Sequence, residues 1–125
     1  METKKFTRVM KALSDPNRVT ILKILARRHL CVCELTALLG LAQSTVSKHL
    51  RILEEAGLVA YEKDGPWINY YLADGSDSLY AATLLGQLET WLEEDPRIRK
   101  ILTGLAQVDR RRLCSGLAPP PRTRG

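Results

Sequence analysis

The feature that most constrains the fold is a change in hydrophobic period near residue 58. Before it, apolar side chains recur every three or four positions, which is typical of amphipathic helices. Residues 58–63 and 67–72 are instead rich in Val, Tyr, Trp and Ile, and Asp64-Gly65-Pro66 separates them. This pattern predicts a β-hairpin with a three-residue tip. A hairpin that follows closely spaced helices limits the chain to few architectures.

Four helices are expected before the hairpin, over residues 4–13, 16–28, 32–39 and 43–56. Asp15 suits the N-cap of the second helix, and Pro16 suits its first position. Gly40 suits the end of the third helix, where the backbone turns left-handed. Two helices around a tight turn, followed by a hairpin, predict a mainly α winged helix-turn-helix.

A long helix is expected after the hairpin, capped by Ser76 or Asp77 and broken at Asp95-Pro96. A last helix is expected over residues 97–113. We therefore divide the chain into a winged helix-turn-helix DNA-binding and dimerisation domain (residues 1–94), a C-terminal helical extension (95–114) and a disordered Pro/Arg-rich tail (115–125).

The charge distribution points to an anionic partner. The 125-residue chain has a formal net charge of +5, and its Lys and Arg are concentrated in the first 58 residues and in the tail. This distribution suits nucleic acid. No apolar run approaches the ~18 residues needed to span a membrane, and no signal peptide is evident, so we expect a cytoplasmic protein.

The helix expected from residue 43 has the two faces of a DNA-reading helix. Val46, Leu50 and Leu53 form an apolar face that can pack on the preceding helix. The opposite face offers amide, hydroxyl and basic groups to base edges and phosphates. His49 fits either a phosphate contact or a structural place between helices. The candidate DNA-binding residues are Gln43, Ser44, Thr45, Ser47, Lys48, His49 and Arg51, with Lys63 on the wing.

The chain carries the motifs ALSDPNR (12–18), LCVCEL (30–35), QSTVSKHL (43–50) and EAGLV (55–59). Together these four motifs resemble the ArsR/SmtB family of bacterial metal-sensing repressors. The resemblance covers about residues 4–92 and implies a homodimer that binds double-stranded operator DNA and releases it when an inducer binds. It also implies a dimer interface between the first helix, through Phe6, Val9, Met10 and Leu13, and the helix carrying residues 79–92.

Cys31 and Cys33 match two of the three thiolates of the family's arsenic- and antimony-sensing branch, and Thr36 stands at the third position. The resemblance thus implies trivalent arsenic or antimony as inducer, which suits soft thiolate ligands. Hydroxide, an organic group or Cys114 remain alternatives for the third ligand. The helix N-terminus and its basic neighbours are expected to lower the thiol pKa values. Metalloid binding would distort the first turn of the helix over residues 32–39 and tilt the reading helix.

Three other functions remain open at this stage. The same scaffold could sense oxidants or reactive sulfur, for instance through a disulfide between Cys33 and Cys114. It could also be a protein-interaction module. An enzyme is disfavoured, because the sequence has no phosphate-cradling glycine loop, no His-Glu-x-x-His and no nucleophile elbow. Structural zinc is disfavoured because only His29 adds an obvious donor to the cysteine pair.

Overall fold

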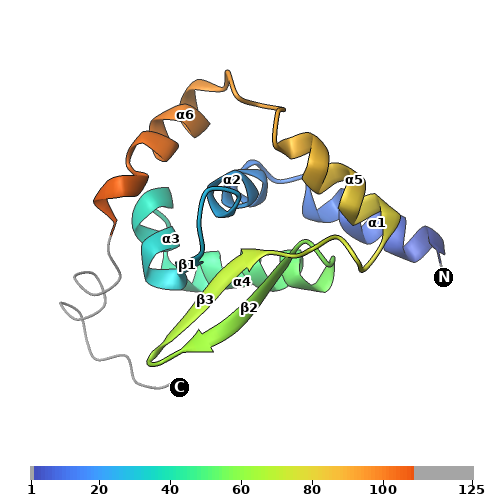
Figure 1. The fold of residues 1–125 in the computed structure, drawn as a ribbon, viewed down its shortest axis with the longest axis horizontal. Helices are drawn as coiled ribbons and strands as arrows, with labels where there is room; N and C mark the ends of the chain where they lie inside the picture. Colours follow the sequence, from blue (N-terminus) through green and yellow to red (C-terminus); the bar gives the residue numbers. More distant parts are fainter. Residues whose placement is uncertain (1, 109–125) are drawn as a thin grey trace.

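The computed structural model describes residues 2–108 and confirms the predicted winged helix-turn-helix. These residues form a set of helices and one small three-stranded antiparallel sheet (Figure 1). None of the described helices is both long and apolar enough to cross a bilayer. The elements are α1 (Glu2–Ala12), α2 (Pro16–Leu25), β1 (Leu30–Cys31), α3 (Val32–Leu39), α4 (Gln43–Glu55), β2 (Val59–Asp64), β3 (Trp67–Leu72), α5 (Leu79–Leu88), α6 (Pro96–Thr103) and a short 3-10 helix (Leu105–Gln107).

Helix α2 is the centre of the core. All six residues from Thr20 to Leu25 are buried, so this helix is covered around its whole circumference. Figure 1 shows α1 and α5 on one side of α2, and α3 and α6 on the other. The start of α2 is fixed as predicted, because the Asp15 carboxylate accepts the N–H of Asn17 at 2.7 Å and Pro16 occupies the first turn.

Helices α3 and α4 form the helix-turn-helix. Gly40 ends α3 with a φ of 69°, and its N–H donates to the Thr36 carbonyl at 2.9 Å. A side chain would have room at this position, since no atom lies within 4 Å of the place of a Cβ. The glycine is therefore explained by its left-handed backbone, which other residues rarely adopt. The predicted packing face of α4 is confirmed, because Val46, Leu50 and Leu53 are fully buried.

The sheet contains one strand that the sequence did not reveal. Strand β1 pairs with β3, with Leu30 opposite Tyr70 and Cys31 opposite Asn69. The hairpin itself is confirmed, but its three-residue tip is wrong: Asp64 pairs with Trp67, so the turn has two residues. A two-residue strand such as β1 has no hydrophobic period, and only its contact with β3 defines it.

The C-terminal half departs most from prediction. The expected long helix ends at Leu88, and its N-cap is Ser78, whose hydroxyl accepts the N–H of Ala81 at 3.1 Å. The chain then turns, and Leu92 adopts a φ of 65°. The Asp95 carboxylate caps α6, which ends at Thr103. The predicted single helix over residues 97–113 is therefore wrong between residues 104 and 108, where Gly104 ends α6 and a 3-10 helix follows (Leu105–Gln107), and residues 109–113 lie outside the described residues.

Candidate DNA-binding and sensing sites

The polar face of α4 is open to solvent. Ala42 offers no side-chain cap to the first turn of α4, where the N–H of Thr45 donates to the Ala42 carbonyl at 3.1 Å. The start of this helix can therefore offer backbone N–H groups to an external acceptor such as phosphate. The exposed residues of this helix include every candidate except His49: Gln43, Ser44, Thr45, Ser47, Lys48 and Arg51. Amide, hydroxyl and basic groups on one exposed helix face can reach base edges and backbone in a major groove.

His49 lies between α4 and α2, with only 9% of its surface exposed. Its Nδ1 is 3.3 Å from Nη1 of Arg18, whose Nε also donates to the Ala12 carbonyl at 2.8 Å. Burial lowers the pKa of His49; the nearby Asp15 opposes this shift, and Arg18 and Lys48 reinforce it. Of the two alternatives for His49, this position favours the structural one.

A hollow of about 520 Å³ lies beside the recognition helix, between α4 and the start of α2. The guanidinium of Arg18 and the ammonium of Lys48 make it basic, and the Asp15 carboxylate is already engaged as the α2 cap. Its surface therefore offers hydroxyl and cationic donors next to the exposed face of α4. The lining residues are Asp15, Arg18, Ser44, Thr45, Lys48, His49 and Ile52.

Lys63 is exposed on β2, one residue before the end of the strand. It lies opposite Ile68 in the hairpin register. The neighbouring Asp64 carboxylate accepts the side-chain amide of Asn69 at 3.2 Å. The wing thus presents one basic side chain close to its turn.

Cys31 sits at the junction of β1 and α3, where the sheet buries it to 2% exposure. Its thiol is free, and burial raises the pKa of this thiol to about 11; backbone hydrogen bonds from Glu34 and Cys33 oppose this shift, and the Glu34 carboxylate adds to it. The expectation of a lowered pKa is therefore wrong for Cys31. Its reason is the unpredicted strand β1, whose burial outweighs the effect of the helix N-terminus.

Cys33 lies in the first turn of α3, is partly buried and is disulfide-bonded. Thr36 follows one turn later, and its Oγ1 is buried without a hydrogen-bond partner among the described residues. Cys114, the tentative third ligand, lies outside residues 2–108. Over that range, no three His, Cys, Asp or Glu side chains gather closely enough to hold a metal ion. The described part of the chain thus places Cys31 and Cys33 at the start of α3 and Thr36 one turn later, with Cys31 a free thiol and Cys33 in a disulfide.

Sequence reasoning missed two residues that shape these sites. Arg18 anchors His49, and Glu34 accepts the backbone N–H of Cys31 at 2.9 Å. The spacing of Glu34, three residues after the N-cap Cys31, is that of a capping box and was a usable signal. Nothing local indicated the partner of Arg18, because the contact joins residues 31 positions apart.

Comparison with known proteins agrees with this architecture. Residues 15–61, from the cap of α2 into β2, match the family described as bacterial regulatory protein, arsR family. The chain is 34% identical to the arsenical resistance operon repressor of Escherichia coli over 109 residues, covering 86% of this chain and 87% of that protein.

Two solved structures share the fold. HlyU from Vibrio cholerae superimposes with a TM-score of 0.61 at 30% identity, covering 73% of this chain and 95% of that one. The homodimeric winged helix-turn-helix domain of Mb0332 from Mycobacterium bovis gives 0.62 at 29% identity, covering 74% and 82%. From its helix-turn-helix, its hairpin wing and these relatives, the chain belongs to the ArsR family of DNA-binding transcriptional regulators, which are not enzymes.

Proposed function

We propose that the protein is a homodimeric repressor that leaves its operator when trivalent arsenic or antimony binds to Cys31 and Cys33. The observation that carries this proposal is the position of the cysteine pair, at the start of a helix that packs directly on the recognition helix. The name of the Escherichia coli relative supports a metalloid signal. Because the proposed partner is operator DNA, we place the protein in the cytoplasm.

DNA recognition is assigned to the exposed face of α4. Gln43 has the amide geometry to pair with adenine, and Arg51 can pair with guanine or phosphate. Lys48 borders the basic hollow beside α2 and is assigned to a phosphate. Ser44, Thr45 and Ser47 contribute hydroxyl contacts, and Lys63 extends the contact from the wing.

The proposed dimer is formed through α1 and α5. Phe6, Met10 and Leu79 are 43%, 37% and 76% exposed, which is unusual for large apolar side chains unless a partner covers them. Phe6 also stacks edge-on against Tyr80, with ring centroids 5.3 Å apart, so the two helices present one surface. Val9, which the sequence placed in this interface, lies instead in the protomer's own core. A two-fold dimer reads two half-sites about one DNA turn apart.

Sensing requires both cysteines as thiols. Arsenite loses two hydroxyl groups as water, the two thiols supply the protons, and two arsenic–sulfur bonds form. The third position on arsenic keeps hydroxide or takes a further ligand, of which Cys114 is one alternative. Drawing both sulfurs onto one atom distorts the first turn of α3, and a coupling of about 1–3 kcal/mol to α4 weakens DNA binding roughly 5- to 150-fold.

The test is fluorescence anisotropy of the reduced protein on its own upstream DNA, with arsenite, zinc or diamide added separately. Release by arsenite alone supports the proposal. The variant Cys33→Ser should bind DNA as the wild type does and ignore arsenite. A Cys33→Ser protein that still responds would show that the sensing site lies elsewhere.

Thiol oxidation is the second candidate signal, and the disulfide at Cys33 favours it. In this alternative, diamide or a polysulfide releases DNA from the reduced protein, whereas arsenite does not. The same anisotropy experiment therefore separates the two signals without changing the DNA-binding assignment.

A further inference from the structure

One nitrogen of Arg28 joins two parts of the chain that are far apart in sequence. Its Nη2 donates to the Glu34 carboxylate at 3.0 Å and to the carbonyl of Val108 at 3.1 Å. Glu34 is only 5% exposed, and its other oxygen accepts the backbone N–H of Cys31 at 2.9 Å. A continuous polar chain thus runs from the cysteine turn to residue 108.

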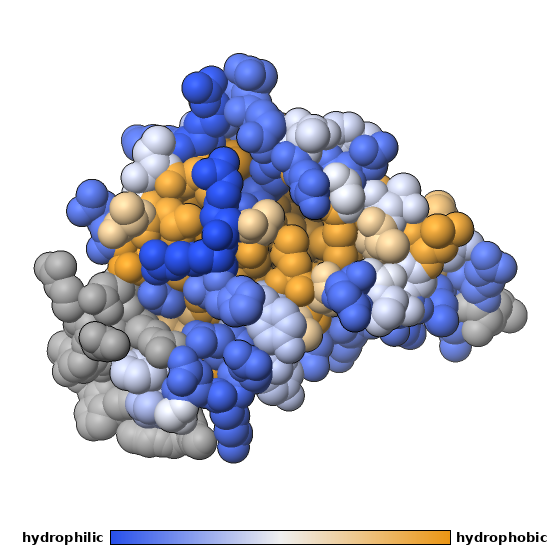
Figure 2. Space-filling view, viewed as in Figure 1, coloured by the Kyte–Doolittle hydropathy of each residue, from blue (hydrophilic) through white to orange (hydrophobic). Residues whose placement is uncertain are grey.

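Residues 96–108, which we name the C-terminal strap, lie over α2 and α3 (Figure 1). Ile98 is buried, and the guanidinium of Arg97 binds Thr20 Oγ1 at 3.1 Å and Asn17 Oδ1 at 2.7 Å on α2. In Figure 2, hydrophobic residues surface in the middle of this face of the molecule, framed by hydrophilic ones. The apolar residues of the strap that pack against the core are Ile98, Ile101, Leu102 and Leu105.

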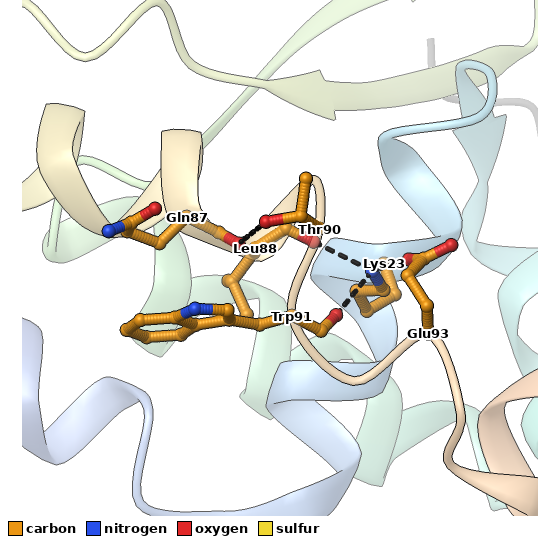
Figure 3. A network of polar contacts seen from close by, with 6 residues as sticks. All are labelled: Lys23, Gln87, Leu88, Thr90, Trp91 and Glu93. Atoms are coloured by element: carbon orange, nitrogen blue, oxygen red, sulfur yellow. Dashed lines mark hydrogen bonds and ion pairs between the residues drawn. The ribbon is translucent and has the colours of Figure 1, made fainter.

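The approach to the strap is fixed by a buried lysine. Lys23, on α2, donates to the carbonyls of Leu88 and Trp91 at 2.6 and 2.7 Å and also contacts the Glu93 carboxylate (Figure 3). This ammonium satisfies carbonyls at the end of α5 and holds the turn that leads to α6. The strap is therefore secured before its start by Lys23, at its start by Arg97 and at its end by Arg28.

We propose that Arg28 is a positioning residue that clasps the C-terminal strap to the Cys31–Cys33 turn, so that displacement of either one loosens the other. The clasp gains its regulatory meaning from the proposed sensing function, on which this inference rests. In this proposal the strap takes part in the response to the inducer, because it stabilises the undistorted Cys31–Cys33 turn.

The physical basis is the double use of one carboxylate. Glu34 divides its two oxygens between the Cys31 N–H and Arg28, and one nitrogen of Arg28 divides its two N–H groups between Glu34 and Val108. Movement of Cys31 therefore pulls Glu34 away from Arg28 or carries Arg28 away from Val108. A buried carboxylate left without a partner is costly, so the two ends are coupled energetically.

Hydrogen exchange of the reduced, full-length protein tests this coupling without an inducer. Glu34→Gln is the gentle perturbation, because it replaces one of the two accepting oxygens with an NH2 group, which then faces either the Cys31 N–H or Arg28, both of them donors. We expect Glu34→Gln and Arg28→Ala each to speed exchange about fivefold or more in both the turn and the strap, with α1 unchanged. Arg28→Lys should keep both segments protected from exchange, since an ammonium can also donate to the Glu34 carboxylate and to the Val108 carbonyl. The exposed neighbour provides the control Arg27→Ala, which should change neither segment.

The reverse perturbation starts from the strap. Leu105→Ala removes apolar contact at its end and should speed exchange of the Cys31 amide. Faster exchange confined to the mutated segment would overturn the clasp, as would faster exchange throughout the molecule, which indicates general destabilisation. In both cases Arg28 would be a local structural residue only.

DNA release, measured on the same variants, separates this inference from the proposed function. Arg28→Ala removes the clasp that stabilises the undistorted turn, so it should lower the arsenite concentration for half-release at least fivefold. DNA affinity before arsenite is added should be unchanged. If arsenite fails to release the wild type while the exchange pattern holds, the sensing proposal fails and the clasp stands. If wild type and Arg28→Ala release DNA at the same arsenite concentration and exchange stays local, the clasp fails and the sensing proposal stands.

Discussion

Arg18 and His49 link the first turn of α2 to the recognition helix, with 3.3 Å between Nη1 and Nδ1. Arg18 is itself held by the carbonyls of Ala12 and Lys11, at the end of α1. The contact therefore ties the reading helix to both the central helix and α1. For Arg18 to donate, Nδ1 of His49 must be unprotonated, which requires a neutral ring.

The first prediction is that stability falls in mild acid because of His49. Its pKa is lower in the fold than the ordinary 6.5, mainly through burial, so the unfolded chain takes up the proton first as pH falls. This contribution is intact above pH 6.5 and is lost as pH falls through the folded pKa. Urea unfolding at pH values on either side of 6.5 measures it. His49→Gln should remove this part of the pH dependence, and the exposed His29→Gln should retain it.

How far the sequence predicts the fold depends on the range of each signal. The helix over residues 32–39 is confirmed with the predicted bounds. Its end could be predicted because Gly40 is a local signal in the sequence. The continuation of α5 to Trp91 and Leu92 is wrong, although both residues keep helical spacing. Lys23, which is far away in sequence, donates hydrogen bonds to the Leu88 and Trp91 carbonyls where α5 ends. No local sequence pattern reveals such a contact.

The second prediction concerns the electrostatic part of DNA binding. Lys48→Ala and Arg51→Ala each remove an exposed positive charge from α4 and should weaken DNA binding. If each contacts one phosphate, the slope of log affinity against log salt should fall by about 1 per substitution. Lys100→Ala, an exposed site on α6, is the matched control and should leave the slope unchanged. Equal slopes for all three variants would remove Lys48 and Arg51 from the DNA interface.

The third prediction is that Leu79→Glu dissociates the dimer. Leu79 is 76% exposed at the first position of α5, where a glutamate also suits the helix dipole, so the protomer should stay folded. A charge at an apolar interface disfavours pairing, and DNA binding falls because one protomer reads one half-site. Light scattering after gel filtration measures the mass. Tyr61→Ser, which removes an exposed aromatic side chain from the wing, should leave the mass unchanged.

The fourth prediction tests the lysine that ends α5. Lys23→Met keeps apolar volume but loses charge-assisted hydrogen bonds to the Leu88 and Trp91 carbonyls. We expect a loss of about 1.5–3 kcal/mol in the free energy of unfolding, measured by urea denaturation. Lys100→Met, on the exposed face of α6, should change it by no more than about 0.5 kcal/mol. A similar small value for Lys23→Met would mean that water replaces the ammonium at these carbonyls.

The candidate sites were less accessible to sequence reasoning than the helices. The exposed face of α4 follows from local periodicity, and the structure leaves its candidates open to solvent apart from His49. The thiol environment does not, because strand β1 buries Cys31 through pairing with β3. Motif spacing therefore placed the cysteine pair at the start of the helix over residues 32–39, where the structure has it, but gave the wrong direction for the pKa of Cys31.

The last prediction uses the position that lacks a third thiol. Thr36 lies one helical turn after Cys33, and side chains three residues apart on a helix are neighbours. Thr36→Cys should add a third sulfur, so that DNA release in the anisotropy assay occurs at a lower arsenite concentration. Stability should change by less than about 1 kcal/mol, because the Thr36 hydroxyl has no hydrogen-bond partner among the described residues.

Thr36→Val is the matched control for this substitution. It removes the buried hydroxyl without adding a thiol, so it should stabilise the fold by about 1 kcal/mol and leave the arsenite response as in the wild type. A shift that appears only with cysteine assigns the effect to the sulfur, since both variants lose the same hydroxyl. Identical release curves for Thr36→Cys and Thr36→Val would place residue 36 outside the sensing site and leave Cys31 and Cys33 to bind arsenic without it.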